Sequence, residues 1–131
     1  LLGRTVKPAQ PRVRRAIHLI EHHVDVRVSI IADEVGVSER QLERLFDERV
    51  GIGPKSLARV VRMRRALSAF AEHRGNASWS RIAAHVGYAD QAHLARDIVR
   101  FTSLTPSQLA HRMTMSDSFK HPLGPLAIVG A

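Results

Sequence analysis

Apolar residues recur every three or four positions along most of the chain, which is the spacing of one face of an α-helix. The longest such stretch covers residues 54–73, and its apolar positions are Leu57, Val60, Met63, Leu67 and Phe70. Gly53 suits the N-cap of this helix, and Pro54 suits its first position, where no backbone donor is needed. Gly75 suits the left-handed turn that ends a helix. The pattern predicts one continuous helix of about 30 Å, at a rise of ~1.5 Å per residue.

Two further helices are predicted near the ends of the chain. Pro11 opens the first, whose apolar face comprises Val13, Ala16, Ile17, Ile20 and Val24. Thr105 is a suitable cap for the last helix, which has Pro106 at its first position and should run to about Met113. We interpret residues 1–10 as a linker and residues 114–131 as a C-terminal tail without predicted structure.

The segments on either side of the long helix repeat each other, which is the observation that organises the chain. Five residues of the first segment recur 51 positions later, namely Ser29, Ile31, Ala32, Val35 and Gly36 as Ser80, Ile82, Ala83, Val86 and Gly87. After one inserted residue the separation is 52, and Leu42, Arg44, Pro54 and Leu57 recur as Leu94, Arg96, Pro106 and Leu109. Each copy is one supersecondary unit.

Each copy has the composition of two short helices joined by a tight glycine turn. Gly36 and Gly87 stand where the chain must turn at positive φ, and Ser38 and Asp90 are suitable N-caps for the second helix. This arrangement is a helix-turn-helix. We therefore predict an all-α fold with a first helix-turn-helix at residues 29–50, a connecting helix at 54–73 and a second helix-turn-helix at 80–102. For a single copy, a helical hairpin that binds nothing would be an equally good interpretation.

Charge favours a polyanionic partner. The 131 residues include 20 Lys and Arg against 12 Asp and Glu, which gives a net charge of +8 and a pI of about 11.4. DNA, RNA and an acidic membrane surface all fit this balance. No apolar run approaches the ~20 residues that span a bilayer, and no signal peptide pattern is present. The chain has no cysteine, so it has no disulfide or thiolate metal site, and we expect a cytoplasmic protein.

The sequence offers little support for metal or enzyme chemistry. His18 and His22 are one helical turn apart, but a third ligand at a defined position is lacking. No nucleophile–base–acid set, phosphate-binding loop or HExxH motif is present. We therefore predict that the chain is not an enzyme and needs neither a metal nor another cofactor.

The outward-facing residues near the start of the second helix of each unit are the candidates for reading bases. They are Arg40, Gln41, Glu43 and Arg44 in the first unit, and Gln91, Ala92, Ala95 and Arg96 in the second. Arg can grip guanine with two hydrogen bonds, Gln can pair with adenine, Glu can accept from cytosine, and Ala can touch a thymine methyl. The alternative is that Arg40, Glu43, Arg44 and Asp47 form a ladder of surface ion pairs.

Affinity should come from phosphate contacts elsewhere, because residues 38–50 carry three Arg against four Asp and Glu. The candidates for phosphate contacts are Ser38, Lys55, Arg59, Arg62, Arg65 and Arg100. In the connecting helix, Lys55, Arg59, Arg62 and Arg65 are expected to lie away from its apolar stripe. A connecting helix of about 30 Å is close to the ~34 Å of one DNA turn. One chain could thus place two reading helices in successive major grooves, and its two half-sites should differ in sequence.

Both units resemble the AraC/XylS family of bacterial transcription regulators. The second unit, IAAHVGYADQAHLARDIVRFTSLTPSQL, is similar to the family signature, and the match extends over residues 11–113. The resemblance implies a seven-helix DNA-binding domain, which is normally the C-terminal part of a regulator with a separate effector-binding or dimerisation domain. Carried over by position, the family's base contacts fall on Arg40, Glu43, Arg44, Gln91, Ala92, Ala95 and Arg96. A contact with RNA polymerase is compatible with this function.

Two departures from the family pattern stand out. Ser103 occupies a position where the family usually has Gly, and Ile98 and Val99 replace a common Phe-Arg pair. We predict sequence-specific binding of double-stranded DNA in transcription regulation. The alternatives are a non-specific nucleic-acid-binding module, which would tolerate scrambled DNA, and a protein-interaction module, whose binding would not fall steeply with salt.

Overall fold

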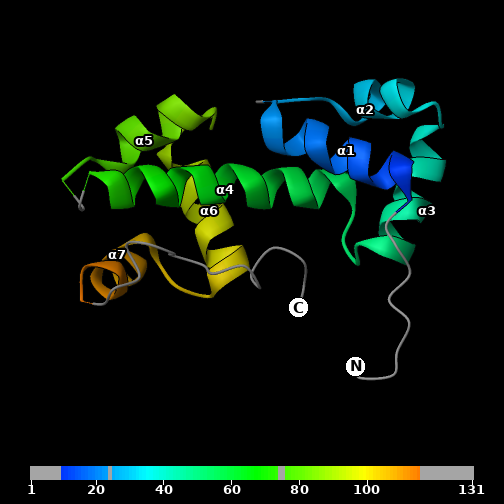
Figure 1. Ribbon diagram of the computed structural model, residues 1–131. Helices are drawn as coiled ribbons and strands as arrows, with labels where there is room; N and C mark the ends of the chain where they lie inside the picture. Colours follow the sequence, from blue (N-terminus) through cyan, green and yellow to red (C-terminus); the bar gives the residue numbers. More distant parts are fainter. Residues whose placement is uncertain (1–9, 24, 74–75, 116–131) are drawn as a thin grey trace. The chain divides into compact units, whose positions relative to one another are not determined.

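The computed structural model describes residues 10–23, 25–73 and 76–115, and all regular structure in that part of the chain is helical (Figure 1). Seven helices, α1 to α7, are present there, which confirms the predicted all-α class. The chain divides into two compact units, residues Leu1–Pro54 and Lys55–Ala131.

The first unit is built from α1 (Pro11–His22), α2 (Val28–Val35) and α3 (Glu39–Arg49). Its buried apolar residues are Val13, Ala16, Leu19, Ile20, Ile31, Ala32, Val35, Leu42, Phe46 and Val50. The predicted apolar face of α1 is therefore shifted slightly, because Leu19 is buried and Ile17 only half-buried. Val24, which we had placed on this face, lies outside the described residues.

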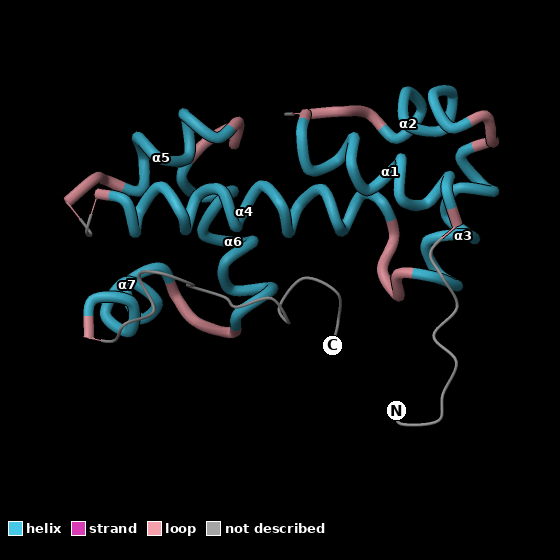
Figure 2. The backbone as a smooth tube through the Cα atoms, viewed as in Figure 1, coloured by secondary structure: helices cyan, strands magenta, loops and turns pink. Residues whose placement is uncertain are grey.

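The turn between α2 and α3 has the predicted glycine and cap. Gly36 adopts the left-handed conformation with φ 77°, and Val37 donates its N–H to the carbonyl of Ala32 at 3.0 Å. Ser38 caps α3 through a reciprocal pair of bonds with Gln41, in which Ser38 Oγ accepts from the backbone N–H of Gln41. The two short helices thus form the helix-turn-helix expected at residues 29–50 (loops in pink, Figure 2).

The connecting helix is α4 (Pro54–Glu72), a continuous helix of 19 residues. It ends one residue before the predicted bound, and Gly75, proposed as its stop, lies outside the described residues. The five predicted apolar positions are buried, together with Val61 and Ala66. The apolar stripe of α4 is therefore wider than the sequence pattern alone suggested.

The second unit packs α5 (Trp79–Val86), α6 (Gln91–Thr102) and α7 (Pro106–Thr114) with α4. Its core comprises Met63, Ala66, Leu67, Phe70, Ile82, Ala83, Val86, Tyr88, Leu94, Ile98, Leu109 and Met113. Helix α5 begins at Trp79, one residue before the predicted bound, because Ser78 and not Ser80 caps it by accepting from the N–H of Arg81. Trp79 stacks on Phe70 with ring centroids 4.3 Å apart, so its indole belongs to this core.

The turn of the second unit repeats the geometry of the first. Gly87 is left-handed with φ 94°, and Tyr88 donates its N–H to the carbonyl of Ala83 at 2.9 Å. Asp90 caps α6 by accepting from the N–H of His93 at 2.7 Å. Equivalent residues therefore make equivalent bonds, 51 positions apart in the turn and 52 positions apart at the cap, as expected for a repeated unit.

Ser103 ends α6 in the left-handed conformation, with φ 61° and ψ 16°. A residue with a Cβ pays about 1–2 kcal/mol for this conformation, whereas Gly costs about 0.5–1 kcal/mol in chain entropy. We expect Ser103→Gly to raise the free energy of unfolding by about 0.5–1 kcal/mol, as measured by thermal denaturation. The control is Ser68→Gly, at an exposed position inside α4, which should lower stability by about 0.5 kcal/mol. If both variants changed the free energy of unfolding in the same direction, this account of Ser103 would be contradicted.

Candidate nucleic-acid interface

The outward face of α3 carries charged side chains. Leu42 and Phe46 are buried and fix which side of the helix meets the core. The four residues predicted to read bases from this helix, Arg40, Gln41, Glu43 and Arg44, are all exposed, as is Asp47. In the described part of the chain no ion pair links Arg40, Glu43, Arg44 and Asp47, so the ladder that was the alternative interpretation is not formed among them. Their charged groups remain available to a ligand.

Gln41 completes the cap predicted at Ser38, and the sequence prediction missed this local structural role of Gln41. The backbone N–H of Ser38 donates to Gln41 Oε1 at 2.9 Å, which completes the capping box. A base contact from Gln41 would have to use its amide nitrogen, and a phosphate contact from Ser38 would compete with the cap. The signal was present in the sequence as Ser-x-x-Gln ahead of an apolar run. The same box recurs between Thr105 and Gln108 in α7.

The outward face of α6 has a different composition. Leu94, Asp97 and Ile98 are buried, and the opposite side of the helix presents Ala92 and Arg96. Gln91 is exposed at the first helical position, and Ala95 is half-buried. The structure thus places all four predicted base-reading residues of the second unit on α6, with Arg96 as the one cation among them.

A buried carboxylate holds α6 to α4. Asp97 has 0% of its side chain exposed, and its Oδ1 accepts from the Arg59 guanidinium at 2.6 Å. Its Oδ2 accepts from the hydroxyl of Tyr88 at 3.2 Å. Arg59, which is 34% exposed, was predicted to contact phosphate; instead it turns toward α6, because a buried carboxylate requires a cationic partner. No local signal in the sequence pairs two residues 38 positions apart.

Tyr88 lies at the centre of this group of charges. Burial raises the pKa of its phenol above the usual value of about 10, and the neighbouring Asp97 carboxylate raises it further. Tyr88 therefore keeps its proton at neutral pH and serves as a donor to Asp97. Its ring also receives a cation, since the guanidinium of Arg62 lies 5.5 Å from the ring centroid.

The other predicted phosphate contacts are distributed along the second unit. Lys55 is exposed at the start of α4, and Arg65 is half-buried further along the same helix. Arg100 is exposed on α6, where its guanidinium lies 5.9 Å from the ring centroid of Phe101. A cation that rests on an aromatic face keeps its charge and part of its hydrogen-bonding capacity.

With this geometry established, comparison with known proteins assigns the family. A family model described as a helix-turn-helix domain matches residues 31–112. The C-terminal domain of AraT, a response regulator from Geobacillus stearothermophilus, is similar with a TM-score of 0.68 and 25% identity, over 82% of this chain and 88% of that one. A transcriptional regulator with an AraC-type DNA-binding domain from Chromobacterium violaceum has the same TM-score and identity, over 86% and 96%. The chain belongs to the AraC/XylS family of DNA-binding domains.

The resemblance predicted from the sequence is therefore confirmed. A DNA-binding transcriptional dual regulator from Escherichia coli K-12 shares the fold of this AraC-type domain, with a TM-score of 0.67 and 21% identity over 86% of this chain and 99% of that one. No curated protein matches the chain in sequence. The family match, at residues 31–112, includes the second helix of the first helix-turn-helix unit and both helices of the second.

Charge is divided unequally between the two units of this AraC-type domain. Residues 1–54 contain nine Lys and Arg against eight Asp and Glu, a net charge of +1. Residues 55–131 contain eleven Lys and Arg against four Asp and Glu, a net charge of +7. Non-specific attraction to phosphate should therefore come almost wholly from the second unit.

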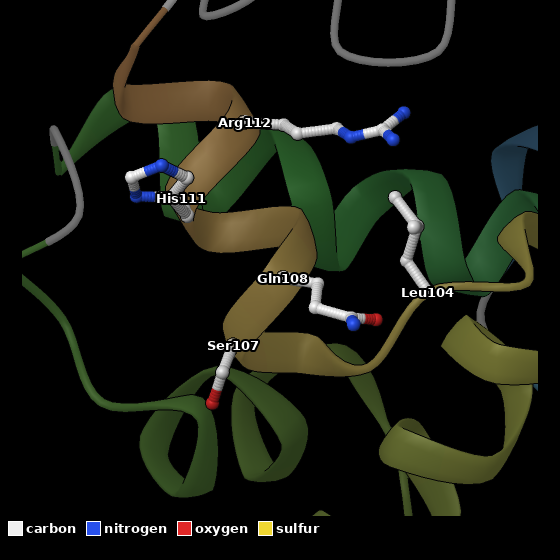
Figure 3. A pocket seen from close by; sticks show the side chains of 5 residues that line it. All are labelled: Leu104, Ser107, Gln108, His111 and Arg112. Atoms are coloured by element: carbon white, nitrogen blue, oxygen red, sulfur yellow. The ribbon is translucent and has the colours of Figure 1, made fainter.

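A surface cavity of about 360 Å³ lies beside α7, lined by Leu104, Ser107, Gln108, His111 and Arg112. The side chains of Ser107, His111 and Arg112 point in three different directions (Figure 3). A small-molecule site needs polar groups that converge on one ligand. We assign no ligand to this cavity.

The described residues offer no other site chemistry. His18 and His22 stack with ring centroids 4.1 Å apart, and the described residues contain no group of three or more potential metal ligands. Among the described helices, none combines the length and the apolar composition that crossing a bilayer requires.

Proposed function

We propose that this AraC-type domain binds double-stranded DNA at specific sequences and thereby regulates transcription. In the proposal α3 and α6 each read bases in a major groove, and the two grooves follow each other along the duplex. The observation that carries the proposal is the duplicated helix-turn-helix, in which each second helix has one buried face and one exposed face that carries an arginine, Arg44 on α3 and Arg96 on α6. A helix of this kind fits the major groove and presents its N-terminal residues to base edges.

The length of α4 supports reading of two grooves by one chain. Nineteen helical residues extend about 28 Å, somewhat less than the ~34 Å of one turn of DNA. The proposal requires both units to approach the same side of the duplex. The two half-sites should differ, because equivalent positions of α3 and α6 carry different side chains.

The two units should contribute differently to binding. With a net charge of +7, the second unit supplies most of the phosphate attraction, and the nearly neutral first unit adds selectivity. Ser38, Lys55, Arg62, Arg65 and Arg100 are the proposed phosphate contacts that remain after Arg59 is assigned to Asp97. A separate effector-binding or dimerisation domain and RNA polymerase are the proposed protein partners, in the cytoplasm. The proposal includes no enzymatic step.

The test is a selection of bound duplexes from a random DNA pool with this chain. Enrichment of two unlike motifs whose centres lie about 10 base pairs apart is the expected result. Enrichment of a single motif would mean that one helix-turn-helix reads bases and the other contacts only the backbone. Binding without enrichment would favour the non-specific alternative, and absence of binding would favour the protein-interaction alternative.

Arg44 and Arg96 are the equivalent arginines of the two reading faces, and both are exposed. Arg44→Ala and Arg96→Ala should each weaken binding to the selected duplex by about 1–3 kcal/mol, while binding to a scrambled duplex changes much less. Fluorescence anisotropy at fixed salt measures both affinities. Arg81→Ala, an exposed position on α5, is the control and should weaken both duplexes about equally. Unchanged discrimination in the Arg44 and Arg96 variants would exclude them as base contacts.

A further inference from the structure

An apolar patch of Ala92, Ala95 and Val99 overlaps the proposed reading face of α6 and extends one turn beyond it. Val99 is 48% exposed and is one of three large apolar residues, with Ile30 and Met115, that are exposed in the described part of the chain. Ala92 is seven residues before Val99, so both occupy the same side of the helix, opposite the buried Leu94 and Ile98. The patch is therefore presented outward, where a helix of a soluble protein usually carries polar groups.

The equivalent face of α3 has the opposite chemistry. At a separation of 52 residues, Ala92, Ala95, Arg96 and Val99 correspond to Arg40, Glu43, Arg44 and Asp47. Every one of these four α3 positions is charged, and on α6 only the arginine is retained. Hydrogen bonds to base edges are thus available along the whole face of α3, but on α6 they are confined to Arg96 and to Gln91 at the start of the helix.

The apolar group that DNA offers in the major groove is the C5-methyl of thymine. The short side chains of Ala92 and Ala95 permit close approach of the α6 backbone to base edges, and Val99 extends the apolar surface by another turn. Arg96 and Arg100 on the same helix supply the charge that a nucleic-acid partner requires. A protein partner with an apolar patch would leave these two cations without a complementary charge.

We infer that α6 reads a thymine-rich half-site through methyl contacts, with Ala92, Ala95 and Val99 as specificity-determining residues. This inference rests on the proposed function, and it adds the class of base that the second unit selects. Each methyl buried against α6 should strengthen binding about fourfold, which is the effect of removing one methylene-sized group from water. The charged face of α3 should instead select guanine and cytosine.

Uracil tests the inference directly, because it lacks only the C5-methyl group of thymine and keeps the same hydrogen bonds. The experiment uses the duplex selected from the random pool, with every thymine of the second half-site replaced by uracil. Fluorescence anisotropy should show a loss of roughly ten- to twentyfold if two methyls are contacted. The matched control is the same replacement in the first half-site, which should change the affinity less than twofold.

A variant at position 99 separates a direct contact from an effect of uracil on the DNA itself. Val99→Thr keeps the shape of the side chain but replaces one methyl group with a hydroxyl, at an exposed position where the fold should tolerate it. The variant should bind the thymine duplex more weakly and lose less on uracil replacement than the unchanged protein. If uracil replacement lowered the affinity of both proteins by the same factor, the role of Val99 would be overturned.

The outcomes distinguish this inference from the proposed function. Specific DNA binding without a uracil effect, or a selected second half-site without thymine, would overturn the inference and leave the proposed function standing. Failure to bind any duplex would overturn both.

Discussion

Ile98→Ala is expected to lower the free energy of unfolding by about 3–4 kcal/mol. Ile98 is completely buried on α6 and belongs to the core that α4, α5, α6 and α7 share. Truncation removes three carbon atoms from this core and leaves a cavity that the neighbouring helices can only partly close. Because α6 carries the proposed reading face, this loss would loosen the element that meets the base edges.

Urea denaturation followed by Trp79 fluorescence measures this loss. The chain has one tryptophan, and its ring stacks on Phe70 in the same core, so the signal reports the second unit. The control is Val99→Ala on the adjacent residue, which is half-exposed and should change stability by less than about 0.5 kcal/mol. If Ile98→Ala and Val99→Ala lowered the free energy of unfolding by similar amounts, the inward and outward faces of α6 would be wrongly assigned. The inference that α6 contacts thymine methyl groups would then also be wrong.

The sequence predicted those parts of the structure that follow local rules. Ser38, Asp90 and Thr105 each cap a helix as expected, because an N-cap is fixed by one side chain and the three residues that follow it. The glycine turns at Gly36 and Gly87 likewise need only positive φ at one position. The repeat supported these predictions further, because the glycine turn and the N-cap occur in both units in the same order.

The family comparison also accounts for the position of Ser103. The resemblance indicated that Gly is usual there, and the structure shows the left-handed backbone that favours Gly. The departure from the family pattern therefore falls on a residue whose backbone conformation is costly for any side chain with a Cβ. The base-reading and phosphate assignments are not tested in this way. The structure places most of those residues on exposed faces, leaves Ala95, Arg62 and Arg65 half-buried, and pairs Arg59 with Asp97. Their contacts with DNA stay predictions.

The parts that the sequence did not predict depend on non-local contacts. Arg59 has the same type and helical spacing as its basic neighbours, and only the fold reveals that it faces a buried carboxylate. Asp97, in turn, occupies an inward position of α6 where an apolar residue is the usual expectation. The assignment of Arg59 to phosphate was wrong about its orientation for this reason.

Asp97→Ala is therefore expected to cost about 3 kcal/mol of stability, the lower end of the effect of breaking a buried ion pair. The variant leaves the Tyr88 hydroxyl and the Arg59 guanidinium without their acceptor, and the partial exposure of Arg59 to solvent moderates the loss. Thermal denaturation gives the measurement. The control is Arg15→Ala, which breaks the exposed 4.0 Å pair with Glu34 and should cost less than about 0.5 kcal/mol.

A second variant distinguishes the unpaired charge from simple loss of packing. Arg59→Met combined with Asp97→Leu replaces the ion pair with apolar side chains that fill similar space, so no charge remains without a partner. Stability should recover to within about 1–2 kcal/mol of the unchanged chain. An apolar replacement avoids the desolvation that a buried pair requires, and the remaining loss comes from the Tyr88 hydroxyl, which still lacks its acceptor. If the double variant were as unstable as Asp97→Ala, the hydrogen bonds of Asp97 would themselves stabilise the second unit. If the stability of the double variant were restored, the Arg59–Asp97 pair would add little to stability, and its main effect would be to fix the position of α6 on α4.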